Sequence, residues 1–479
     1  MAEYEPVIGL EIHVHLQTRT KMFCGCELSF GDEPNVHTCP VCLAHPGVLP
    51  VPNEKAIRYA LMIAAALGCE VAPRSIFHRK NYFYPDNPKA YQISQYDIPL
   101  ATGGRLGEVR IHRVHLEEDA AKMIHVGESG RIHGSGASLV DFNRAGTPLV
   151  EIVSEPDLRS ASEVRAWAQL LQTTVRQLGV SDVQMEEGSL RVDGNVSLRP
   201  AGSEELGVKT ELKNMNSFRF LERGIEAEIE RQRAQLEAGE AVNQETLHFD
   251  PSSGTLTPLR SKEYEHDYRY FPEPDLVPLA PTKEMLREAV EALPELPSEK
   301  IKRYSKDLGL PADVAALLAG EVETGEYFER ALRASDGADP TTIANWVTGE
   351  LAGALRQSGE EVGPAQSKVE PESLAKLVGM VHSKQVSHGS AKQVLAELIA
   401  KGGDPAEIVE REGLGQIGGG EELEGVVEAA IEAEPEAAEQ VRDGNEKAIG
   451  RIVGAVMKET KGRADGGDVQ RLIREKLGT

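Results

Sequence analysis

The distribution of polar and apolar residues changes character once along this chain, near LPELP at 293–297. Before that point, alternating stretches typical of strands lie between helical stretches, at 5–16, 108–118, 190–198 and 207–213. After it, the pattern is helical almost throughout and is broken by Gly and Pro. We therefore expect an α+β fold, in which an N-terminal domain on a mixed or antiparallel sheet precedes an all-helical domain and a small helical tail.

A glycine-rich stretch at 402–420 marks a second change along the chain. Together the two changes predict a domain over 1–292, a helical domain over 293–408 and a helical tail over 409–479. A chain of 479 residues is long enough for several such domains. No apolar run approaches the roughly 18–20 residues that a membrane span needs, so we expect no membrane segment and a cytoplasmic protein.

Helix-end signals accompany the predicted helices of the first part. The helix at 56–67 ends at Gly68, the helix at 161–178 begins with a capping box of Ser160 and Glu163, and the helix at 218–238 ends at Gly239. Helical patterns in the second part lie at 298–308, 312–319, 340–356, 372–382, 390–401, 405–411, 421–432, 446–459 and 467–476. The sequence thus predicts strands in the first part only.

Four of the five cysteines lie in one short window, as C-x-C-x₁₂-C-x₂-C at Cys24, Cys26, Cys39 and Cys42. Two close pairs separated by a dozen residues are typical of a tetrahedral zinc site. Four thiolates leave no open position, so a structural zinc is favoured over a catalytic one. Met1 leads directly into EYEPVIGLE without a signal peptide, so we expect a reducing compartment and disfavour disulfides. Free thiols are the remaining alternative.

Alternation assigns the side chains of each predicted strand to two faces. The apolar faces hold Leu10, Ile12, Val14 and Leu16, then Leu190, Val192, Val196 and Leu198, then Val208, Thr210 and Leu212. The polar faces hold Glu11, His13 and His15, then Arg191, Asp193, Asn195 and Ser197, then Lys209, Glu211 and Lys213. The strand at 108–118 runs into HLEED, which we expect to place Glu117, Glu118 and Asp119 together.

Carboxylates mixed with histidine and cations recur on these polar faces. An ordinary sheet also has a wet face of mixed charges, but repetition on several strands favours a site. Carboxylate oxygens suit Mg²⁺ and neighbouring cations suit phosphate groups, a combination that fits ATP. The sequence has no G-x-x-x-x-G-K-[ST] loop and no G-x-G-x-x-G after a strand, which excludes P-loop and Rossmann sites.

Four segments dense in polar groups are further candidates, because sites often lie on loops. They are HRKNYFYPDNPKAYQISQYDIP at 78–99, LVDFNRAGTPLVEIVSEPD at 139–157 with Asn143, Arg144 and Gly146, KNMNSF at 213–218 with Asn214 and Asn216, and HDYRYFPEPDL at 266–276 with His266, Asp267 and Arg269. Each segment taken alone is also consistent with loop chemistry or core packing.

Seven motifs together resemble the GatB family, the B subunits of the tRNA-dependent amidotransferases. They are VIGLEIHVHL, KNYFYPDNPKAYQISQ, HLEEDAAK, DFNRAGTPLVEIVSEPD, EEGSLRVDGNVSLRP, KTELKNMNSF and HDYRYFPEPDL. The resemblance covers nearly the whole chain and implies an N-terminal cradle related to glutamine synthetase. A helical domain and a tail that helps to hold tRNA follow in that family.

The resemblance implies a carbon–nitrogen ligase that converts Glu-tRNA(Gln) to Gln-tRNA(Gln), or Asp-tRNA(Asn) to Asn-tRNA(Asn). Members phosphorylate the side-chain carboxylate with ATP and Mg²⁺, and ammonia then attacks. The ammonia comes from an amidase subunit, GatA, and a small subunit, GatC, completes the heterotrimer. This chain carries no extended Gly/Ser amidase signature and no Cys–His glutaminase arrangement, which agrees with a separate ammonia source.

Position-by-position matching carries the family's site residues onto this chain. The metal-site residues fall on Glu11, His13, Glu117, Glu118, Asp193 and Glu211. Arg191, Lys209 and Lys213 on the same faces are the expected phosphate-binding cations. Lys80, together with Glu117 or Glu118, is assigned to the admission of ammonia, and which glutamate does so stays open. The segment QETLHFD at 244–250 departs from the family, in which an arginine often follows QET.

A net charge of −25 argues against nonspecific nucleic-acid binding by the whole surface. The tail nevertheless carries a basic cluster, Arg442, Lys447, Arg451, Lys458, Lys461 and Arg463. We expect it to contact tRNA phosphates, the alternative being simple solvation of a helix. Two other function classes are disfavoured. The carboxylate-bearing strands argue against a zinc-clamped tRNA-binding module without its own chemistry. The long helical half argues against a free-standing small-molecule ligase, because a small substrate needs no such arm. The acceptor stays open between Glu-tRNA, Asp-tRNA and both.

Overall fold

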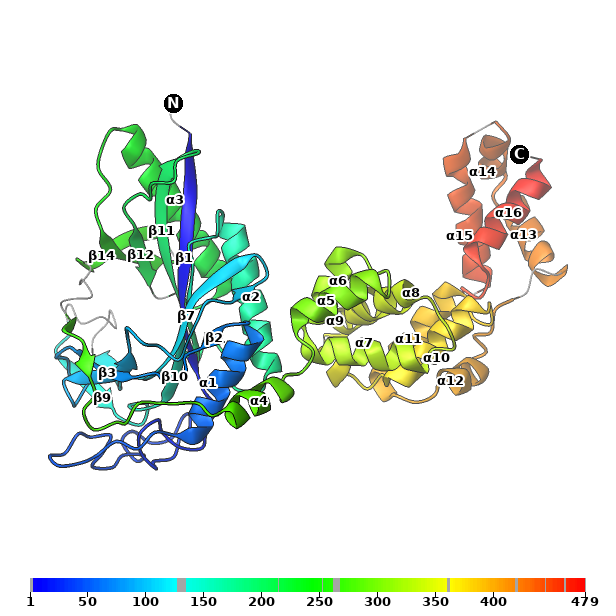
Figure 1. Cartoon of the computed structure of the whole chain (residues 1–479). Coiled ribbons are helices and arrows are strands. Elements are labelled where there is room, and N and C mark those ends of the chain that lie inside the picture. Colours follow the sequence, from blue (N-terminus) through cyan, green and yellow to red (C-terminus); the bar gives the residue numbers. More distant parts are fainter. Residues whose placement is uncertain are drawn as a thin grey trace. The chain divides into compact units, whose positions relative to one another are not determined.

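The fold is described from a computed structural model of the chain (Figure 1). The described residues are 3–126, 135–213, 215–251, 253–261, 268–359, 362–417, 421–443, 445–460 and 462–478. The chain divides into two compact units, Met1–Pro297 and Ser298–Thr479. Within the described residues, no helix combines the length and the apolar character that crossing a membrane requires.

The first unit is built on a sheet whose described strands run in the order β14-β13-β12-β11-β1-β10-β7-β5-β2, with β6 paired to β7. The strands are β1 (Tyr4–His15), β2 (Glu70–Val71), β5 (Ala101–Thr102), β6 (Arg105–Leu106), β7 (Val109–Glu118), β10 (Pro148–Ser154), β11 (Leu190–Pro200), β12 (Thr210–Lys213), β13 (Glu245–Asp250) and β14 (Thr255–Ser261). β1 is antiparallel to both β10 and β11, whereas β12 and β13 are parallel. A mixed sheet followed by helices confirms the predicted fold class.

One face of this sheet is apolar and packs against helices. Alternation places Leu10, Ile12 and Val14 of β1 on that face, and each is at most 1% exposed. They share one core with α1 (Glu54–Ala66), α2 (Ala161–Gln177) and α3 (Phe218–Glu237). Burial of each such aliphatic side chain contributes about 1.5–3 kcal/mol. The opposite face of the sheet carries the polar side chains.

The starts of these helices follow their sequence signals. Asn53 Oδ1 accepts hydrogen bonds from the backbone N–H groups of Lys55 and Ala56 at the start of α1. At α2, Ser160 Oγ accepts from the N–H of Glu163 at 3.2 Å, as the capping box predicts. The Glu163 carboxylate accepts from the N–H of Arg159 at 2.9 Å, so the return bond of the box falls one residue earlier than expected.

A bulge in β7 keeps its apolar side chains on the core face on both sides of the irregularity. The register against β10 shifts between Val153 and Ser154, so that Val153 pairs with Arg113 and Ser154 pairs with Ile111. The extra residue of this bulge lets Ile111 and Val114 both join the core. Beyond it, strict alternation aims Arg113, His115 and Glu117 at the polar face.

Two small sheets complete the first unit. β3 (Phe77–Asn81), β4 (Tyr91–Gln95) and β15 (Phe271–Pro272) form one, and the hairpin of β8 (Lys122–Val126) and β9 (Ala137–Asp141) forms the other. β4 lies against the end of β7, where Gln95 Oε1 accepts from the N–H of Leu116 at 3.0 Å. A short helix, α4 (Lys283–Glu291), packs on α1. The contact of β4 with β7 brings the small sheet to the edge of the polar face.

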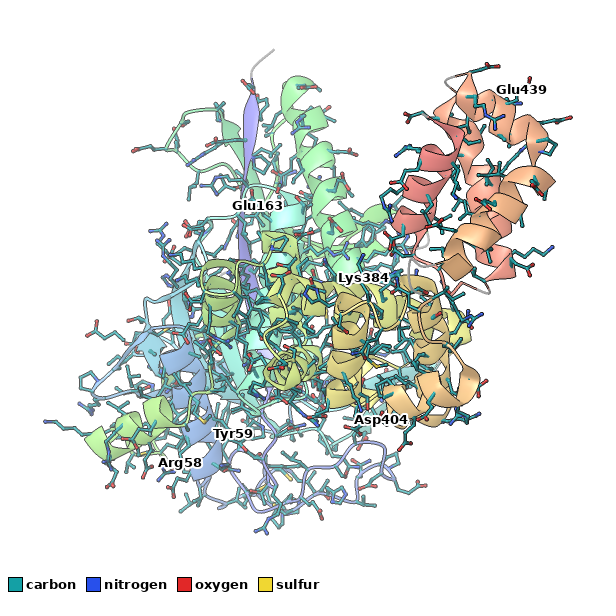
Figure 2. The ribbon with its side chains drawn as sticks, turned by 90° about the vertical axis from the view of Figure 1, so that its right-hand side faces the viewer. Arg58, Tyr59, Glu163, Lys384, Asp404 and Glu439 are labelled. Atoms are coloured by element: carbon teal, nitrogen blue, oxygen red, sulfur yellow. The ribbon has the colours of Figure 1, made fainter. Side chains whose placement is uncertain are left out.

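The second unit is helical in its described residues. Its elements are α5 (Pro297–Lys306), α6 (Ala312–Gly320), α7 (Val322–Ala334), α8 (Pro340–Asn345), a π-helical stretch (Trp346–Leu351), α9 (Ala352–Ser358), a 3₁₀ turn (Pro364–Gln366), α10 (Pro371–His382), α11 (His388–Lys401), α12 (Pro405–Glu412), α13 (Glu421–Ala433), α14 (Pro435–Arg442), a 3₁₀ turn (Glu446–Ala448), α15 (Ile449–Glu459) and α16 (Gly466–Leu477). One apolar cluster runs from Tyr304 to Leu414 and another from Ile417 to Leu477. Asp404, labelled in Figure 2, is the N-cap of α12 and accepts from the N–H of Ala406 at 2.8 Å.

Several elements were not predicted from the sequence. α7 was not predicted because its sequence contains Gly325, and a glycine often marks the end of a helix. A Cβ at this position would lie 2.6 Å from the carbonyl oxygen of Leu318. The glycine therefore serves a close approach and does not end the helix. The predicted strand at 207–213 begins only at Thr210, so that Val208 and Lys209 precede it and are exposed. β13 and β14 were also missed, and QETLHFD forms β13 beside β12.

Candidate functional site

The polar face of the large sheet gathers ionisable side chains from neighbouring strands. Register pairs Glu11 with Asp193, His13 with both Arg191 and Glu151, and Glu151 in turn with His115. Paired residues on adjacent antiparallel strands point to the same face and lie side by side. The pairing therefore produces two groups of side chains, one around His13 and one around Asp193.

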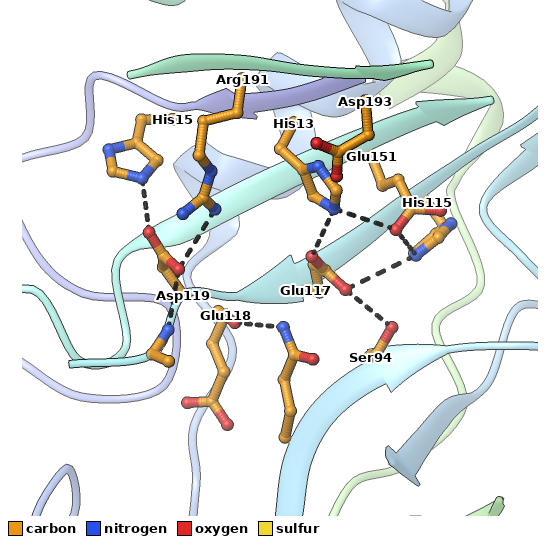
Figure 3. A network of polar contacts seen from close by, with 12 residues as sticks. His13, His15, Ser94, His115, Glu117, Glu118, Asp119, Glu151, Arg191 and Asp193 are labelled. Atoms are coloured by element: carbon orange, nitrogen blue, oxygen red, sulfur yellow. Dashed lines mark hydrogen bonds and ion pairs between the residues drawn. The ribbon is translucent and has the colours of Figure 1, made fainter. Parts of the chain in front are cut away.

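The first group, called here the His13 cluster, consists of His13, His115, Glu117 and Glu151 (Figure 3). His13 Nε2 lies 3.2 Å from Glu151 Oε2 and 3.5 Å from Glu117 Oε1. His115 Nε2 lies 3.8 Å from Glu117 Oε2 and 3.7 Å from Glu151 Oε2. Ser94 Oγ, on β4, donates to Glu117 Oε2 at 3.1 Å. Each carboxylate therefore lies between two imidazole rings. Both carboxylates are buried.

The surroundings set the protonation of this cluster. Burial acts against the charge of His13, but its hydrogen bond with Glu151 and the charges of Glu151 and Glu117 outweigh burial and raise the pKa of His13. Burial would raise the pKa of Glu151, but the charge of His115 and the hydrogen bond with His13 hold that pKa well below its usual value. The pKa of Glu117 is lowered too, because contacts with His115 and His13 overcome burial and the charge of Glu151. Both carboxylates are therefore anionic at neutral pH.

The His13 cluster can hold a divalent cation. One ligand atom each of His13, Glu117 and Glu151 lies within 4.8 Å of the other two. Two carboxylate oxygens and one imidazole nitrogen form a donor set that suits Mg²⁺ or Mn²⁺. His115 Nδ1 is buried and has no hydrogen-bond partner among the described residues. Glu151 and His115 were not among the predicted site residues, although Glu151 is the one charged residue in the run PLVEIVS and alternation would place it on the polar face.

The second group, called here the carboxylate row, consists of Glu11, Asp193 and Glu211 with Lys213. Lys213 Nζ lies 2.8 Å from Asp193 Oδ2 and 3.1 Å from Glu211 Oε1. Asn195 Nδ2 donates to Glu11 Oε1 at 3.2 Å. Burial would lower the pKa of Lys213, but Asp193 and Glu211 outweigh it and raise that pKa. All four predicted residues thus share one stretch of the polar face, and Lys213 neutralises part of its negative charge.

β13 supports the carboxylate row from the edge. Thr246 Oγ1 donates to Glu211 Oε2 at 2.9 Å, and Thr246 pairs with Glu211 in the register of β12 and β13. The segment that departs from the family pattern therefore orients one of the predicted site carboxylates.

A buried carboxylate at the end of β7 links several cations. Asp119 Oδ2 lies 2.7 Å from His15 Nε2, and Asp119 Oδ1 accepts from Arg191 Nη2 at 3.2 Å. Arg144 Nε lies 3.5 Å from Asp119 Oδ2. Burial would raise the pKa of Asp119, but the charges of Arg191 and Arg144 and the hydrogen bond with His15 hold it well below its usual value. Asp119 therefore positions Arg191, one of the predicted phosphate-binding residues.

Lys80 of β3 reaches toward the His13 cluster. Its Nζ lies 4.8 Å from the ring centroid of Tyr268. Burial acts against its charge, yet Tyr270, Glu117 and Glu151 outweigh burial and raise the pKa of Lys80. The charges of Glu117 and Glu151 thus act on Lys80. The resemblance implied Lys80 together with Glu117 or Glu118, and that assignment stays a prediction.

Two predicted site residues, Glu118 and Lys209, lie elsewhere. Glu118 follows Glu117 on β7 and therefore points to the opposite face, where its Oε1 accepts from the N–H of Ile93 at 3.0 Å and pairs with Lys89. The expected grouping of Glu117 with Glu118 is not observed, because adjacent strand residues alternate. Lys209 is exposed before the start of β12. Asn214, His266, Asp267 and Lys461 lie outside the described residues.

A cleft of about 500 Å³ opens beside these groups. Its lining includes His13, Arg191, Asp193 and Lys213, together with Phe30. A volume of this size falls in the range that accommodates a cofactor or a nucleotide. Anionic and cationic groups therefore line the same cleft.

The four predicted zinc ligands come together beside the end of β1. The thiol groups of Cys24, Cys26, Cys39 and Cys42 lie within 4.8 Å of one another. Cys42 Sγ lies 4.0 Å from Cys26 Sγ and 3.9 Å from Cys39 Sγ, close to the roughly 3.8 Å edge of a tetrahedron with Zn–S bonds of about 2.3 Å. None of the four forms a disulfide.

A lysine supports this thiol cluster. Lys21 is 1% exposed, and its Nζ donates to Cys42 Sγ at 3.6 Å and to the carbonyl oxygen of Phe142 at 2.9 Å. The hydrogen bond from Cys24, with smaller contributions that include the charge of Lys21, lowers the pKa of Cys42 to about 4. Four sulfur atoms at these separations complete a tetrahedral shell, so the donor set fits a closed metal site.

Comparison with known proteins defines the class. A family model described as the GatB/GatE catalytic domain matches residues 6–287, which contain the whole polar face and the thiol cluster. A second, described as the GatB domain, matches residues 326–477 of the helical unit. The chain thus combines the catalytic domain of this class with its helical domain.

Curated relatives are similar over their full length, and several are named as the B subunit of aspartyl/glutamyl-tRNA(Asn/Gln) amidotransferase. The protein of Moorella thermoacetica is 49% identical over 483 residues, covering 99% of this chain and 100% of its own. That of Thermus thermophilus is 49% identical over 480 residues, covering 99% of each chain, and that of Persephonella marina is 47% identical over 483 residues, covering 99% and 100%. The chain belongs to the GatB family, the B subunits of these amidotransferases.

Proposed function

We propose that this chain is the subunit that activates the side-chain carboxylate of Glu-tRNA(Gln), Asp-tRNA(Asn) or both. It transfers a phosphoryl group from ATP to that carboxylate and then directs ammonia onto the resulting acyl phosphate. The products are Gln-tRNA(Gln) and Asn-tRNA(Asn). A free carboxylate is a poor electrophile, so activation must precede amide formation.

The observation that carries this proposal is the cleft in which carboxylates, the His13 imidazole and cations meet. Lys213 and Arg191 line it beside Asp193 and His13. Phosphoryl transfer depends on positioning and on charge stabilisation, which metal ions and cations provide. Full-length similarity to the named B subunits supports the same reaction.

The residues divide the work by chemistry. The His13 cluster and the carboxylate row offer oxygen and imidazole donors that would hold Mg²⁺, which neutralises phosphate charge when bound. Lys213 and Arg191 would contact phosphate oxygens, and Asp119 would keep Arg191 in position. Water must be kept from the acyl phosphate, and the buried state of Glu117 and Glu151 agrees with a sheltered reaction centre.

Ammonia would come from an amidase partner, GatA, in a complex completed by GatC. The names of the relatives describe one subunit of a larger enzyme. Lys80 lies within the electrostatic reach of Glu117 and Glu151, so it would lie beside the path by which ammonia reaches the activated carboxylate. Glu118 and Lys89 form an ion pair on the opposite face. They line a cavity there together with Cys24 and Cys42 of the thiol cluster.

The thiol cluster would hold one structural Zn²⁺. Four thiolates complete a tetrahedral shell, so no position is left for a substrate. Its contribution is to the fold of the loop between the cysteine pairs and not to the reaction.

The decisive test is the reconstituted three-subunit complex with ATP, Mg²⁺ and each misacylated tRNA in turn. Release of ADP that requires the misacylated tRNA, together with formation of the amidated product, supports the proposal. ATP hydrolysis that ignores tRNA would point to a free-standing small-molecule ligase. Tight tRNA binding without any ADP release would point to a binding module. Comparison of Glu-tRNA(Gln) with Asp-tRNA(Asn) in the same assay decides the acceptor.

A further inference from the structure

An exposed aromatic ring lines the cleft beside the phosphate-binding cations. Phe30 is 74% exposed, yet it belongs to the same cleft lining as Arg191, Asp193 and Lys213. A single exposed apolar side chain on a protein surface needs no explanation. An exposed ring that is held in place next to a charged cleft does need an explanation. The contacts of the loop that carries Phe30 show how firmly it is held.

The loop of Phe30, residues 27–38, is fixed at its two ends. It connects Cys24 and Cys26 to Cys39 and Cys42, whose thiol groups come together. Within the loop, Ser29 Oγ donates to the Asp32 carboxylate, which also lies 2.7 Å from His37 Nε2. These two contacts close the short turn that carries Phe30.

The middle of the loop is docked onto the end of β9. Asn35 Oδ1 accepts from the N–H of Phe142 at 2.7 Å, and the N–H of Asn35 donates to Asp141 Oδ1 at 3.0 Å. Asn143 Oδ1 accepts from the N–H of His37 at 2.8 Å, and Asn143 Nδ2 donates to the carbonyl oxygen of Glu33 at 2.8 Å. The ring of Phe30 is thus presented by a loop that is held at three places, although the ring itself buries little surface.

The lining near Phe30 has three chemical characters. Met185 and Met215 supply apolar, polarisable surface, and Lys122, Lys213 and Arg191 supply positive charge. Glu186, Glu187 and Asp193 supply negative charge, which a bound Mg²⁺ would offset beside phosphates. A ring for stacking with cations beside it is the combination that recognises a nucleobase joined to phosphates. A small carboxylate substrate would need the cations but not the aromatic ring.

We propose that Phe30 stacks on an adenine ring that enters the cleft, and that the cysteine-fixed loop exists to hold it there. This inference rests on the proposed function, which brings two adenines to the site. One belongs to ATP, and the other is the 3′-terminal adenosine of the tRNA. Stacking is the chemistry that both sources share.

The test compares Phe30→Ala with Phe30→Trp in the full-length chain assembled with its partners. Binding of ATP with Mg²⁺ is measured by calorimetry in the absence of tRNA. Binding of tRNA is measured by filter retention with two transcripts, one intact and one lacking the terminal adenosine. Val36→Ala is the matched control, because Val36 is 56% exposed on the same loop but does not line the cleft. Zinc content and the thermal midpoint of each variant check that the loop is intact.

Phe30→Ala is expected to weaken the binding of one of the two ligands roughly 5- to 150-fold, the range for stacking of one base. Phe30→Trp and Val36→Ala are expected to bind both ligands within about twofold of the wild-type affinity. A loss confined to ATP identifies the adenine of ATP. A loss confined to the intact transcript identifies the terminal adenosine. If Phe30→Ala binds both ligands as wild type does, the stacking role is refuted and the proposed function stands. If the wild-type complex binds neither ligand, both proposals fail.

Discussion

Glu151 occupies the centre of the His13 cluster, although it lies in a strand that is otherwise apolar or small. Its carboxylate lies 3.2 Å from the ring nitrogen of His13, and Arg113 Nη2 donates to its other oxygen at 3.4 Å. These neighbours stabilise the anionic form and hold the pKa of Glu151 well below its usual value. An anionic carboxylate beside His13 and Glu117 is a donor for a divalent cation, so the position argues for a direct role in the reaction.

Replacement of Glu151 tests that role. Glu151→Gln keeps the shape but removes the charge that a divalent cation needs, so amidation should fall roughly 10²-fold or more, as for loss of one electrostatic contact in a transition state. The measurement is the rate of Gln-tRNA formation by the reconstituted complex. Glu155→Gln, whose carboxylate contacts the exposed His112 at 2.9 Å, is the matched control and should react normally. A normal rate for Glu151→Gln would remove this residue from the site.

Asp119 provides a pH-dependent prediction. Its pKa in the folded state is held well below the ordinary 3.8 by Arg191, His15 and Arg144. A depressed carboxyl pKa stabilises the folded state above the unfolded pKa, and that stabilisation is lost as the pH falls through the folded pKa. Asp119→Asn should therefore lower the free energy of unfolding by about 1.5–3 kcal/mol at pH 7, and the difference from wild type should shrink below about pH 4. Urea unfolding of both proteins between pH 3 and 7 measures it, and a difference that does not change with pH would contradict the assignment.

At the scale of elements, alternation predicted most of the polar face. β1 and β11 carry Glu11, His13 and Asp193 as expected, because a strand packed on helices on one side has a strict period of two. Two features were beyond this reasoning. The partner of each strand is set by long-range pairing, so the meeting of Glu151 with His13 was not foreseen. The start of β12 is set by its neighbours, which left Lys209 before it. The expected grouping of Glu117 with Glu118 is not observed because alternation, applied to this strand, points adjacent side chains to opposite faces.

The cysteine loop is the element whose role the sequence indicated most directly. We expect one zinc per chain, and Cys39→Ser should release it, since three thiolates and a hydroxyl bind zinc far more weakly. Loss of the metal should loosen the loop 27–38 and lower the thermal midpoint of the first unit. Cys69→Ser is the control, because Cys69 lies outside the thiol cluster. Elemental analysis of freshly purified, reduced protein gives the stoichiometry, and a wild-type protein without zinc would contradict the prediction.

At the scale of the whole molecule, the helical tail separates from the rest of the helical unit in its packing. Its apolar side chains, from Ile417 to Leu477, form a cluster distinct from that of Tyr304–Leu414. The exposed side chains of Arg442, Lys447, Arg451 and Lys458 lie on this tail, within a chain whose net charge is −25. Exposed basic side chains attract phosphates locally even when the net charge of the whole molecule is negative.

Removal of the tail after Gln416 should therefore weaken tRNA binding and reduce its dependence on salt. Each phosphate interaction that is removed lowers the magnitude of the slope of log K against log[salt] by roughly 0.7–0.9. A variant with Arg442, Lys447, Arg451 and Lys458 all changed to Gln is the matched comparison, since it keeps the apolar cluster. It should reproduce the loss of slope without loss of helix content. ATP binding by the first unit should not change in either protein, because the tail has its own apolar cluster. Filter binding at two or more salt concentrations measures the slope, and an unchanged slope in both variants would mean that the tail does not contact tRNA.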